Sequence, residues 1–232
     1  MKNKIQFAAW ILLMATAGIG PAQADTVFTV TLNTAPLVGS PGSSAGPFSL
    51  AFQLTDGSGL GDANNTATIS DFQFGSVGSA GACPAACTVF GGASGDIGST
   101  VVLTDSGFFN ALLEGFTPGD SLSFLVDLTT NLDSGSVPDA FAFSILDGSG
   151  FSVPTLDPSG ADTLLTVNLD SANPGILTYA TDASRLTNGV SLSIGAPLVG
   201  PPVSSVPEPN SLLLMGAGIA GLALTVRKRS RR

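Results

Sequence analysis

Apolar and polar residues alternate along most of the chain between residues 27 and 194, and this period of two is typical of half-buried β-strands. In the clearest example, every second residue of the segment 121–128 is apolar, namely Leu122, Phe124, Val126 and Leu128. Similar short segments, bounded by the turn formers Gly, Pro, Asp and Ser, predict further strands at residues 27–32, 48–54, 66–74, 88–90, 100–103, 140–146, 163–169, 176–179 and 190–194.

Two segments depart from simple alternation. Residues 108–116 carry Phe and Leu at spacings that fit one face of a helix, but the segment is short and fits a paired strand equally well, so both interpretations stay open. In residues 66–74 the alternation breaks near Ile69, which indicates a β-bulge or a strand that is apolar on both faces.

Short strands separated by turns indicate a mainly β fold. Several of the predicted strands have one apolar face, and such faces are buried when two sheets cover each other. At most one helix is expected in this part of the chain. We therefore predict an antiparallel β-sandwich of jelly-roll type.

The N-terminus has the features of an export signal. Lys2 and Lys4 precede the apolar stretch 7–19, and Ala22, Gln23 and Ala24 form a small-x-small cleavage site before Asp25. This order predicts a signal peptide over residues 1–24, which is handled by the Sec machinery and removed by signal peptidase. An N-terminal membrane anchor is the weaker alternative, because the apolar stretch is too short and the cleavage site follows it directly.

The C-terminus contains three features in a fixed order. The first is the tetrapeptide Val206, Pro207, Glu208 and Pro209. An uncharged run over residues 212–226 follows, whose large apolar side chains are Leu212, Leu213, Leu214, Met215, Ile219, Leu222, Leu224 and Val226. The chain ends in a basic cluster made of Arg227, Lys228, Arg229, Arg231 and Arg232.

The apolar run predicts a short transmembrane helix. With Ser211 it has 16 residues, which as a helix span about 24 Å, less than the roughly 30 Å of a bilayer core. Long basic side chains at its end can snorkel and the bilayer can thin, so a short span remains feasible. The basic cluster is expected on the cytoplasmic side. The alternative is a buried core helix, but a helix that is apolar all round needs lipid or protein around it.

The ordered tetrapeptide, apolar helix and Arg-rich end resemble the PEP-CTERM sorting signal, a tail also catalogued as an ice-binding-protein C-terminal domain. The resemblance covers only residues 206–232. It implies recognition by exosortase, a transpeptidase-like enzyme of the inner membrane, and processing near Pro207, Glu208 and Pro209. The resemblance further implies delivery to the cell surface or extracellular matrix of a Gram-negative bacterium, in a setting rich in exopolysaccharide. It gives little reason to expect ice binding.

These signals divide the chain into a signal peptide (1–24), a β-sandwich passenger domain (25–195), a Pro-rich linker (196–205) and a sorting signal (206–232). Seven of the eight cations lie in the two targeting ends, which leaves Arg185 as the single cation of residues 25–205. The same residues hold 16 of the 17 acids, so their formal charge is −15. This charge excludes a nucleic-acid-binding surface and makes divalent cations plausible ligands.

The two cysteines, Cys83 and Cys87, are separated by three residues. In an oxidising exported setting we expect them to form a disulfide that closes a small loop and acts as a structural staple. Metal ligation is a poor alternative, because the chain has no histidine and two thiolates do not complete a tetrahedral site.

The chain contains few of the side chains that enzymes use for catalysis, so we expect a protein that is not an enzyme and needs no cofactor. Without histidine there is no Ser-His-Asp or Cys-His arrangement. Residues 25–205 contain no lysine, one arginine and one tyrosine, Tyr179, so common electrophilic groups are missing. Paired carboxylates could hydrolyse glycosides, but fifteen of the sixteen acids are Asp, and most lie beside turn-forming residues.

Calcium binding is one functional hypothesis. Asp56, Ser58 and Asp62 place oxygen atoms two to four residues apart among glycines, a spacing that suits a calcium loop. Leu60 stands where a third polar side chain is needed, and Ala67 stands where an EF-hand has its closing Glu. Turn aspartates that accept hydrogen bonds from backbone amides explain the same pattern without a metal, and this interpretation is favoured.

Carbohydrate binding is a second hypothesis, which follows from the expected sandwich and the exopolysaccharide setting. Exposed Trp or Tyr usually supply sugar-stacking surfaces, yet the single Trp, Trp10, lies in the signal peptide. We therefore expect an exported surface or matrix protein without small-molecule chemistry, with a calcium- or carbohydrate-binding module as the alternative.

Overall fold

The computed structural model describes residues 26–39, 46–57, 59, 61–83, 85–131, 137–169, 175–186 and 192–199. Within these residues no helix is long and apolar enough to cross a membrane. The predicted signal peptide, the tetrapeptide at 206–209, the apolar run 212–226 and the basic cluster lie outside the described residues.

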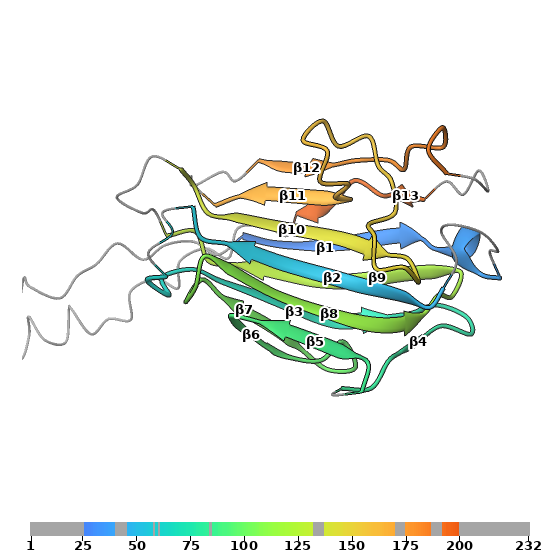
Figure 1. Ribbon diagram of the computed structural model, residues 1–232, viewed down its shortest axis with the longest axis horizontal. Helices are drawn as coiled ribbons and strands as arrows, with labels where there is room; N and C mark the ends of the chain where they lie inside the picture. The colour runs from blue at the N-terminus through green and yellow to red at the C-terminus, as the bar shows by residue number, and fades with distance from the viewer. Residues whose placement is uncertain are drawn as a thin grey trace, which may run out of the picture.

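The described chain forms two antiparallel sheets, which Figure 1 shows face-on. Sheet A contains β1 (Thr26–Asn33), β3 (Thr66–Gln73), β6 (Gly92–Gly95), β7 (Val101–Thr104), β9 (Ser121–Leu128), β13 (Ser193–Ile194) and β14 (Leu198–Val199). Sheet B contains β2 (Phe48–Thr55), β4 (Ser79–Ala80), β5 (Cys87–Phe90), β8 (Phe109–Thr117), β10 (Ala140–Leu146), β11 (Leu165–Asn168) and β12 (Ile176–Thr178). One short 3₁₀ helix, η1 (Ala35–Leu37), follows β1.

The strand pairing is nested. In sheet A the order is β13-β1-β9-β3-β7-β6, with β14 also paired to β1. In sheet B it is β12-β11-β10-β2-β8-β4, with β5 also paired to β8. Thus β1 pairs with β9, β2 with β8 and β3 with β7. The chain changes sheet at each step from β1 to β4 and again from β7 to β10. This alternation brings the ends of strands from both sheets together at each end of the sandwich.

The core lies between the sheets and is built from the inward positions of the alternating strands. Phe52 on β2 is fully buried, and its ring lies 5.1 Å from that of Phe143, 5.4 Å from Phe124 and 5.9 Å from Phe72 between ring centres. Each fully buried large apolar side chain stabilises the fold by about 1.5–3 kcal/mol. The prediction of two mutually covering antiparallel sheets is therefore confirmed.

The two segments with broken alternation have clear outcomes. Residues 109–117 form strand β8, so the helix interpretation of residues 108–116 is wrong. The reason is tertiary, because β8 pairs along its whole length with β2 on one side and with β5 and β4 on the other. The bulge predicted near Ile69 is confirmed, and it lies a few residues further along the chain. There the register shifts between Ser70 and Gln73, and Asp71 has a φ of +55°.

Three strands were not predicted. β4 has only two residues and is a strand because it pairs with the end of β8. β6 is made of Gly, Ala and Ser residues without an apolar pattern, and it is a strand because its backbone pairs with β7. β14 lies inside the predicted linker 196–205, where Leu198 pairs with Thr29 of β1. Sheet A therefore extends past residue 195 into that segment.

Candidate functional site

One end of the sandwich is closed by buried polar side chains instead of apolar ones. Asp56 follows β2, Asn65 precedes β3, Asp105 follows β7 and Asp139 precedes β10. Each of the four is at most 3% exposed. Because β2 and β10 belong to sheet B whereas β3 and β7 belong to sheet A, these residues join the ends of both sheets. We call these four residues the aspartate cluster.

The loop after β2 packs into this end of the sandwich. Asp56 accepts hydrogen bonds from the backbone N–H of Gly59, at 2.7 Å, and of Gly61. At Gly57 a Cβ atom would lie 2.3 Å from the carbonyl oxygen of Pro138, so only glycine allows this approach. At Gly61, φ is +64° and a Cβ would lie 2.7 Å from the carbonyl oxygen of Ser106. The glycines therefore seat the loop against the segments that carry Asp105 and Asp139.

Asn65 connects the aspartates across the two sheets. Its backbone N–H donates to Asp105 Oδ2 at 3.0 Å, and its side-chain Nδ2 donates to Asp139 Oδ2 at 2.8 Å. The N–H of Gly57 donates to Asp139 Oδ1 at 2.8 Å. Asn65 Oδ1 in turn accepts from the N–H of Asn131 at 2.7 Å. Both oxygens of Asp139 are thus held in place, and its carboxylate is oriented toward the cluster.

Asp105 is the one member of the cluster whose carboxyl group is incompletely satisfied. Its Oδ1 is buried and receives no hydrogen bond from any described residue. The carboxyl group of Asp139 lies within hydrogen-bonding reach of Asp105. Burial and, after it, the carboxyl groups of Asp139 and Asp62 together raise the pKa of Asp105 to about 7, although the hydrogen bond from the Asn65 N–H lowers it. Two facing carboxyl groups need a proton or a cation between them to attract each other.

The residues of the predicted calcium loop differ in burial and in the groups that they bind. Asp56 is buried and uses both oxygens on backbone amides, which is the arrangement that the turn interpretation describes. Asp62 is exposed and accepts from the N–H and Nδ2 of Asn64, at 3.3 and 3.1 Å. Ser58 lies outside the described residues. Calcium ligation by this loop stays a prediction. Asn65, Asp105 and Asp139 were not predicted from the sequence as site residues.

A second polar site surrounds the cysteines. The disulfide between Cys83 and Cys87 is confirmed, with Cα atoms 5.2 Å apart. Cys87 on β5 is paired with Glu114 on β8, and the Glu114 side chain is fully buried. Glu114 Oε2 accepts the N–H of Ile97 at 2.8 Å, whereas Oε1 receives no hydrogen bond from the described residues. Burial raises the pKa of Glu114, the Ile97 N–H lowers it, and Asp96 raises it further.

Glu114 and the two cysteines are the only three His, Cys, Asp or Glu side chains in the described ranges whose potential metal-ligand atoms all lie within 4.8 Å of one another. The two sulfur atoms are already bonded to each other. A disulfide sulfur is not the thiolate that metal ligation requires. The site is therefore described as a disulfide beside a buried acid.

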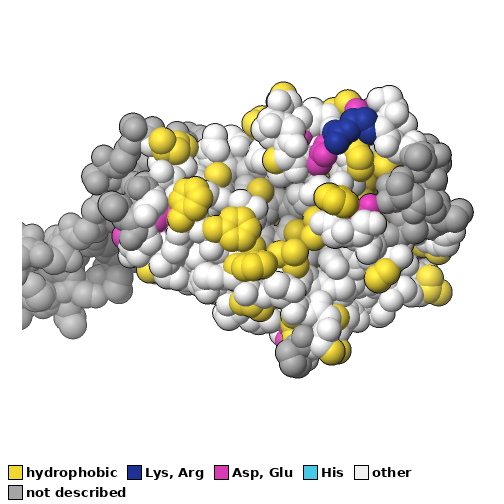
Figure 2. Space-filling view, in the orientation of Figure 1, with side chains coloured by type: hydrophobic (Ala, Val, Ile, Leu, Met, Phe, Trp, Pro, Cys, Tyr) yellow, Lys and Arg dark blue, Asp and Glu magenta, His cyan; other side chains and the backbone are white. Residues whose placement is uncertain are grey.

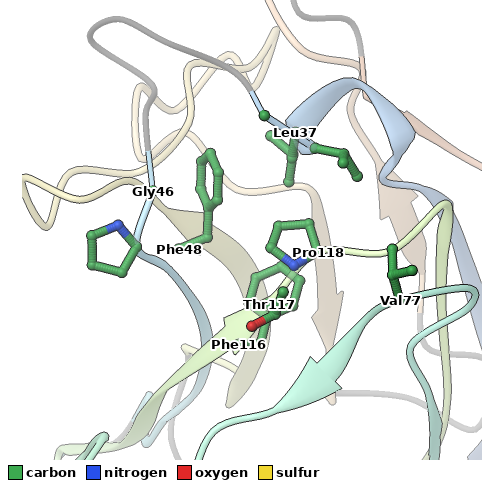
Figure 3. A pocket seen from close by; sticks show the side chains of 10 residues that line it. Leu37, Gly46, Phe48, Val77, Phe116, Thr117 and Pro118 are labelled. Carbon is green, nitrogen blue, oxygen red and sulfur yellow. The ribbon is translucent and has the colours of Figure 1, made fainter.

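Two concave surfaces lie away from these polar sites. Figure 3 shows a pocket of about 500 Å³ between η1, the start of β2 and the turn after β8, with Leu37, Phe48, Phe116 and Pro118 among its lining residues and no charged side chain. A groove of about 330 Å³ lies on the outer face of sheet B. Figure 2 shows hydrophobic side chains gathered in a band on this face. Phe109 lines the groove, and its ring centre lies 5.8 Å from that of Phe90.

Among the described residues, Arg185 forms a salt bridge with Asp162. Its Nη1 and Nη2 donate to Asp162 Oδ1 and Oδ2 at 2.6 and 2.7 Å. These hydrogen bonds lower the pKa of Asp162. Arg185 is also the sole cation of residues 25–205, and its charge is not among those that act on Asp105.

Comparisons with known proteins find a match for the C-terminal tail only. The family of the PEP-CTERM protein-sorting motif matches residues 205–229. Neither a curated protein nor a solved structure matches the chain. The matched segment contains Pro207, Glu208 and Pro209 together with the whole apolar run and the first three basic residues. The chain therefore carries a PEP-CTERM sorting motif, which implies an exported protein that an exosortase-type enzyme processes at the membrane.

Proposed function

We propose that this protein is a non-enzymatic component of the cell surface or extracellular matrix. The observation that carries the proposal is the PEP-CTERM sorting motif at residues 205–229. In the proposed route, the Sec machinery and signal peptidase act on residues 1–24, and the apolar run 212–226 holds the chain in the inner membrane. Exosortase then cuts near Pro207, Glu208 and Pro209 and passes the β-sandwich to the outside, where it associates with exopolysaccharide or biofilm.

The chemistry of the described residues supports a role without catalysis. The buried acids of the sandwich mostly accept hydrogen bonds from backbone amides, as Asp56 does from Gly59 and Gly61. A general acid or base must reach a substrate, and Glu114 and Asp105 are fully buried. The nested pairing of β1 with β9, β2 with β8 and β3 with β7 supports a sandwich of jelly-roll type.

The sorting proposal is tested by changing the motif in a strain that contains an exosortase. The triple variant P207A/E208A/P209A removes the motif, and P201A/P202A is the matched control in the preceding Pro-rich segment. We expect the unchanged chain and the control to appear as a shortened product in the surface or matrix fraction, with the cut site located by mass spectrometry. The triple variant should stay uncut in the inner membrane. Identical processing of the triple variant, or an uncut chain in the cytosol, would refute the proposal.

The groove on sheet B favours one alternative, a carbohydrate-binding module. Its lining is uncharged and combines an aromatic ring, Phe109, with the polar side chains of Gln53, Ser144 and Thr163. Phe109 is 42% exposed, and aromatic faces with nearby hydroxyl or amide groups suit a neutral sugar. Retention of the protein on purified exopolysaccharide, lost in F109A and kept in the exposed-ring control F151A, would favour this alternative. Equal behaviour of both variants would exclude the groove.

A further inference from the structure

The aspartate cluster poses an electrostatic problem that the protein groups alone do not solve. Asp105 and Asp139 are 0% and 3% exposed, and their carboxyl groups lie within hydrogen-bonding reach. Asp105 Oδ1 receives no hydrogen bond from the described residues. A buried polar atom without a partner costs about 1–3 kcal/mol, and more when it belongs to a charged group. Native structures usually supply such an atom with a water, an ion or a proton.

The surroundings add negative charge and no positive side chain. Asp56 lies in the same end of the sandwich, and Asp62 is close enough for its charge to act on Asp105. The single cation of residues 25–205, Arg185, is bound to Asp162. Residues 25–205 as a whole carry a formal charge of −15. The local field therefore attracts small cations to this end of the molecule.

The geometry also leaves ligand capacity at the right place. Each oxygen of Asp139 accepts one hydrogen bond, from Gly57 and Asn65, and a carboxylate oxygen has room for a second partner. Asp105 Oδ2 accepts from Asn65, and its Oδ1 is free to bind. Asp62 lies outside the cluster and is exposed, and its charge acts on Asp105. Buried carboxylates that backbone amides hold in position, with an exposed carboxylate beside them, suit a partly hydrated cation.

We propose that Asp105 and Asp139 bind a calcium ion at the end of the sandwich, with Asp62 at the solvent-exposed entrance and water completing the ligand shell. Calcium fits better than magnesium, because Ca²⁺ accepts six to eight oxygen ligands in irregular geometry, whereas Mg²⁺ requires near-ideal octahedral geometry. The ion joins sheet A, through Asp105, to sheet B, through Asp139. This site shares only Asp62 with the predicted loop of Asp56, Ser58 and Asp62, and it does not depend on the proposed surface role.

The test uses the full chain in mild detergent, stripped with EDTA and returned to chelator-free buffer at pH 7.5. Calorimetric titration with CaCl₂ should show one saturable site. Thermal unfolding with Ca²⁺ at about 100 times its Kd should shift Tm upward by roughly 5–10 °C. The variant D105N keeps the side-chain size but removes the charge and the unpaired oxygen. We expect it to bind Ca²⁺ at least about tenfold more weakly, because site charge sets calcium affinity.

The matched control is D147N, which makes the same charge change in the turn after β10, where Asp147 accepts hydrogen bonds from the backbone N–H groups of Ser149 and Phe151. It should keep the calcium response. If D105N does not fold, D62N serves instead, because Asp62 is exposed, and it should also weaken binding. The proposal is overturned if the unchanged chain gives neither heat nor a Tm shift, which would mean that a proton alone joins the carboxyl groups. Equal responses to MgCl₂ and CaCl₂, or equal losses in D105N and D147N, would overturn it too.

Discussion

The buried acid beside the disulfide allows a sharp prediction about pH and stability. Glu114 is fully buried, Ile97 N–H donates to its Oε2 at 2.8 Å, and its Oε1 has no hydrogen-bond partner among the described residues. In the variant E114Q, the amide oxygen keeps the acceptor for Ile97, while the side chain loses its negative charge. In E114L, the side chain is apolar and the N–H of Ile97 loses its acceptor.

The sign of the effect follows from the direction of the pKa. Burial raises the pKa of Glu114 in the folded state above its ordinary value of 4.5, so the folded protein binds this proton more tightly than the unfolded chain. This contribution is complete below pH 4.5 and is lost as pH rises through the raised pKa. E114Q does not titrate. We therefore expect E114Q to match the unchanged protein near pH 4 and to be more stable at pH 8, by about 1–3 kcal/mol, the cost of one unpaired buried group.

The measurement is urea unfolding of the full chain in mild detergent, followed by far-UV circular dichroism at several pH values between 4 and 8. E114L is the companion variant and should lie below E114Q by about 1–3 kcal/mol at every pH, because the Ile97 N–H then has no acceptor. The reasoning is refuted if E114Q is no more stable than the unchanged protein at pH 8, or if the difference between them is the same at pH 4 and pH 8.

Two further predictions concern the core and the disulfide. F52A should destabilise the protein by about 3–5 kcal/mol in urea unfolding, whereas F151A, whose ring is 72% exposed, should change stability by less than about 0.5 kcal/mol; similar effects of both would contradict the proposed core. The double variant C83S/C87S removes a cross-link that closes a five-residue loop, and loop entropy predicts a loss of about 2 kcal/mol in thermal unfolding. Unchanged stability would show that the disulfide is not a staple.

Most strands could be predicted because their information is local. β9 shows a period of two over eight residues, and each of its inward positions is buried, so the pattern and the structure agree. β8 shows the limit of this reasoning, since Phe109 and the preceding Phe108 are exposed and the inward positions are Asn110, Leu112, Glu114 and Phe116. Its apolar residues lie on both faces, and only the neighbouring strands make it a strand. β6 has no apolar pattern and could not be found.

The aspartate cluster was hidden for a similar reason. Asn65 and Asp105 are 40 residues apart and Asn65 and Asp139 are 74 apart, and they meet only because β3, β7 and β10 begin or end at the same end of the sandwich. From the sequence, each aspartate is one more turn former next to a strand. The Asp56 loop was found because its residues are close in sequence, and the structure shows its carboxylate bound to backbone amides.

The sequence by itself determined the PEP-CTERM sorting motif, the acidic charge of residues 25–205, the β-rich class and the cysteine pairing. These properties depend on short linear segments, on composition or on neighbouring residues. Tertiary structure alone decided the strand register, the burial of Glu114 against the disulfide and the meeting of Asp105 with Asp139. These depend on which distant segments pair, and such pairing is set by the mutual burial of two sheets and not by any local pattern.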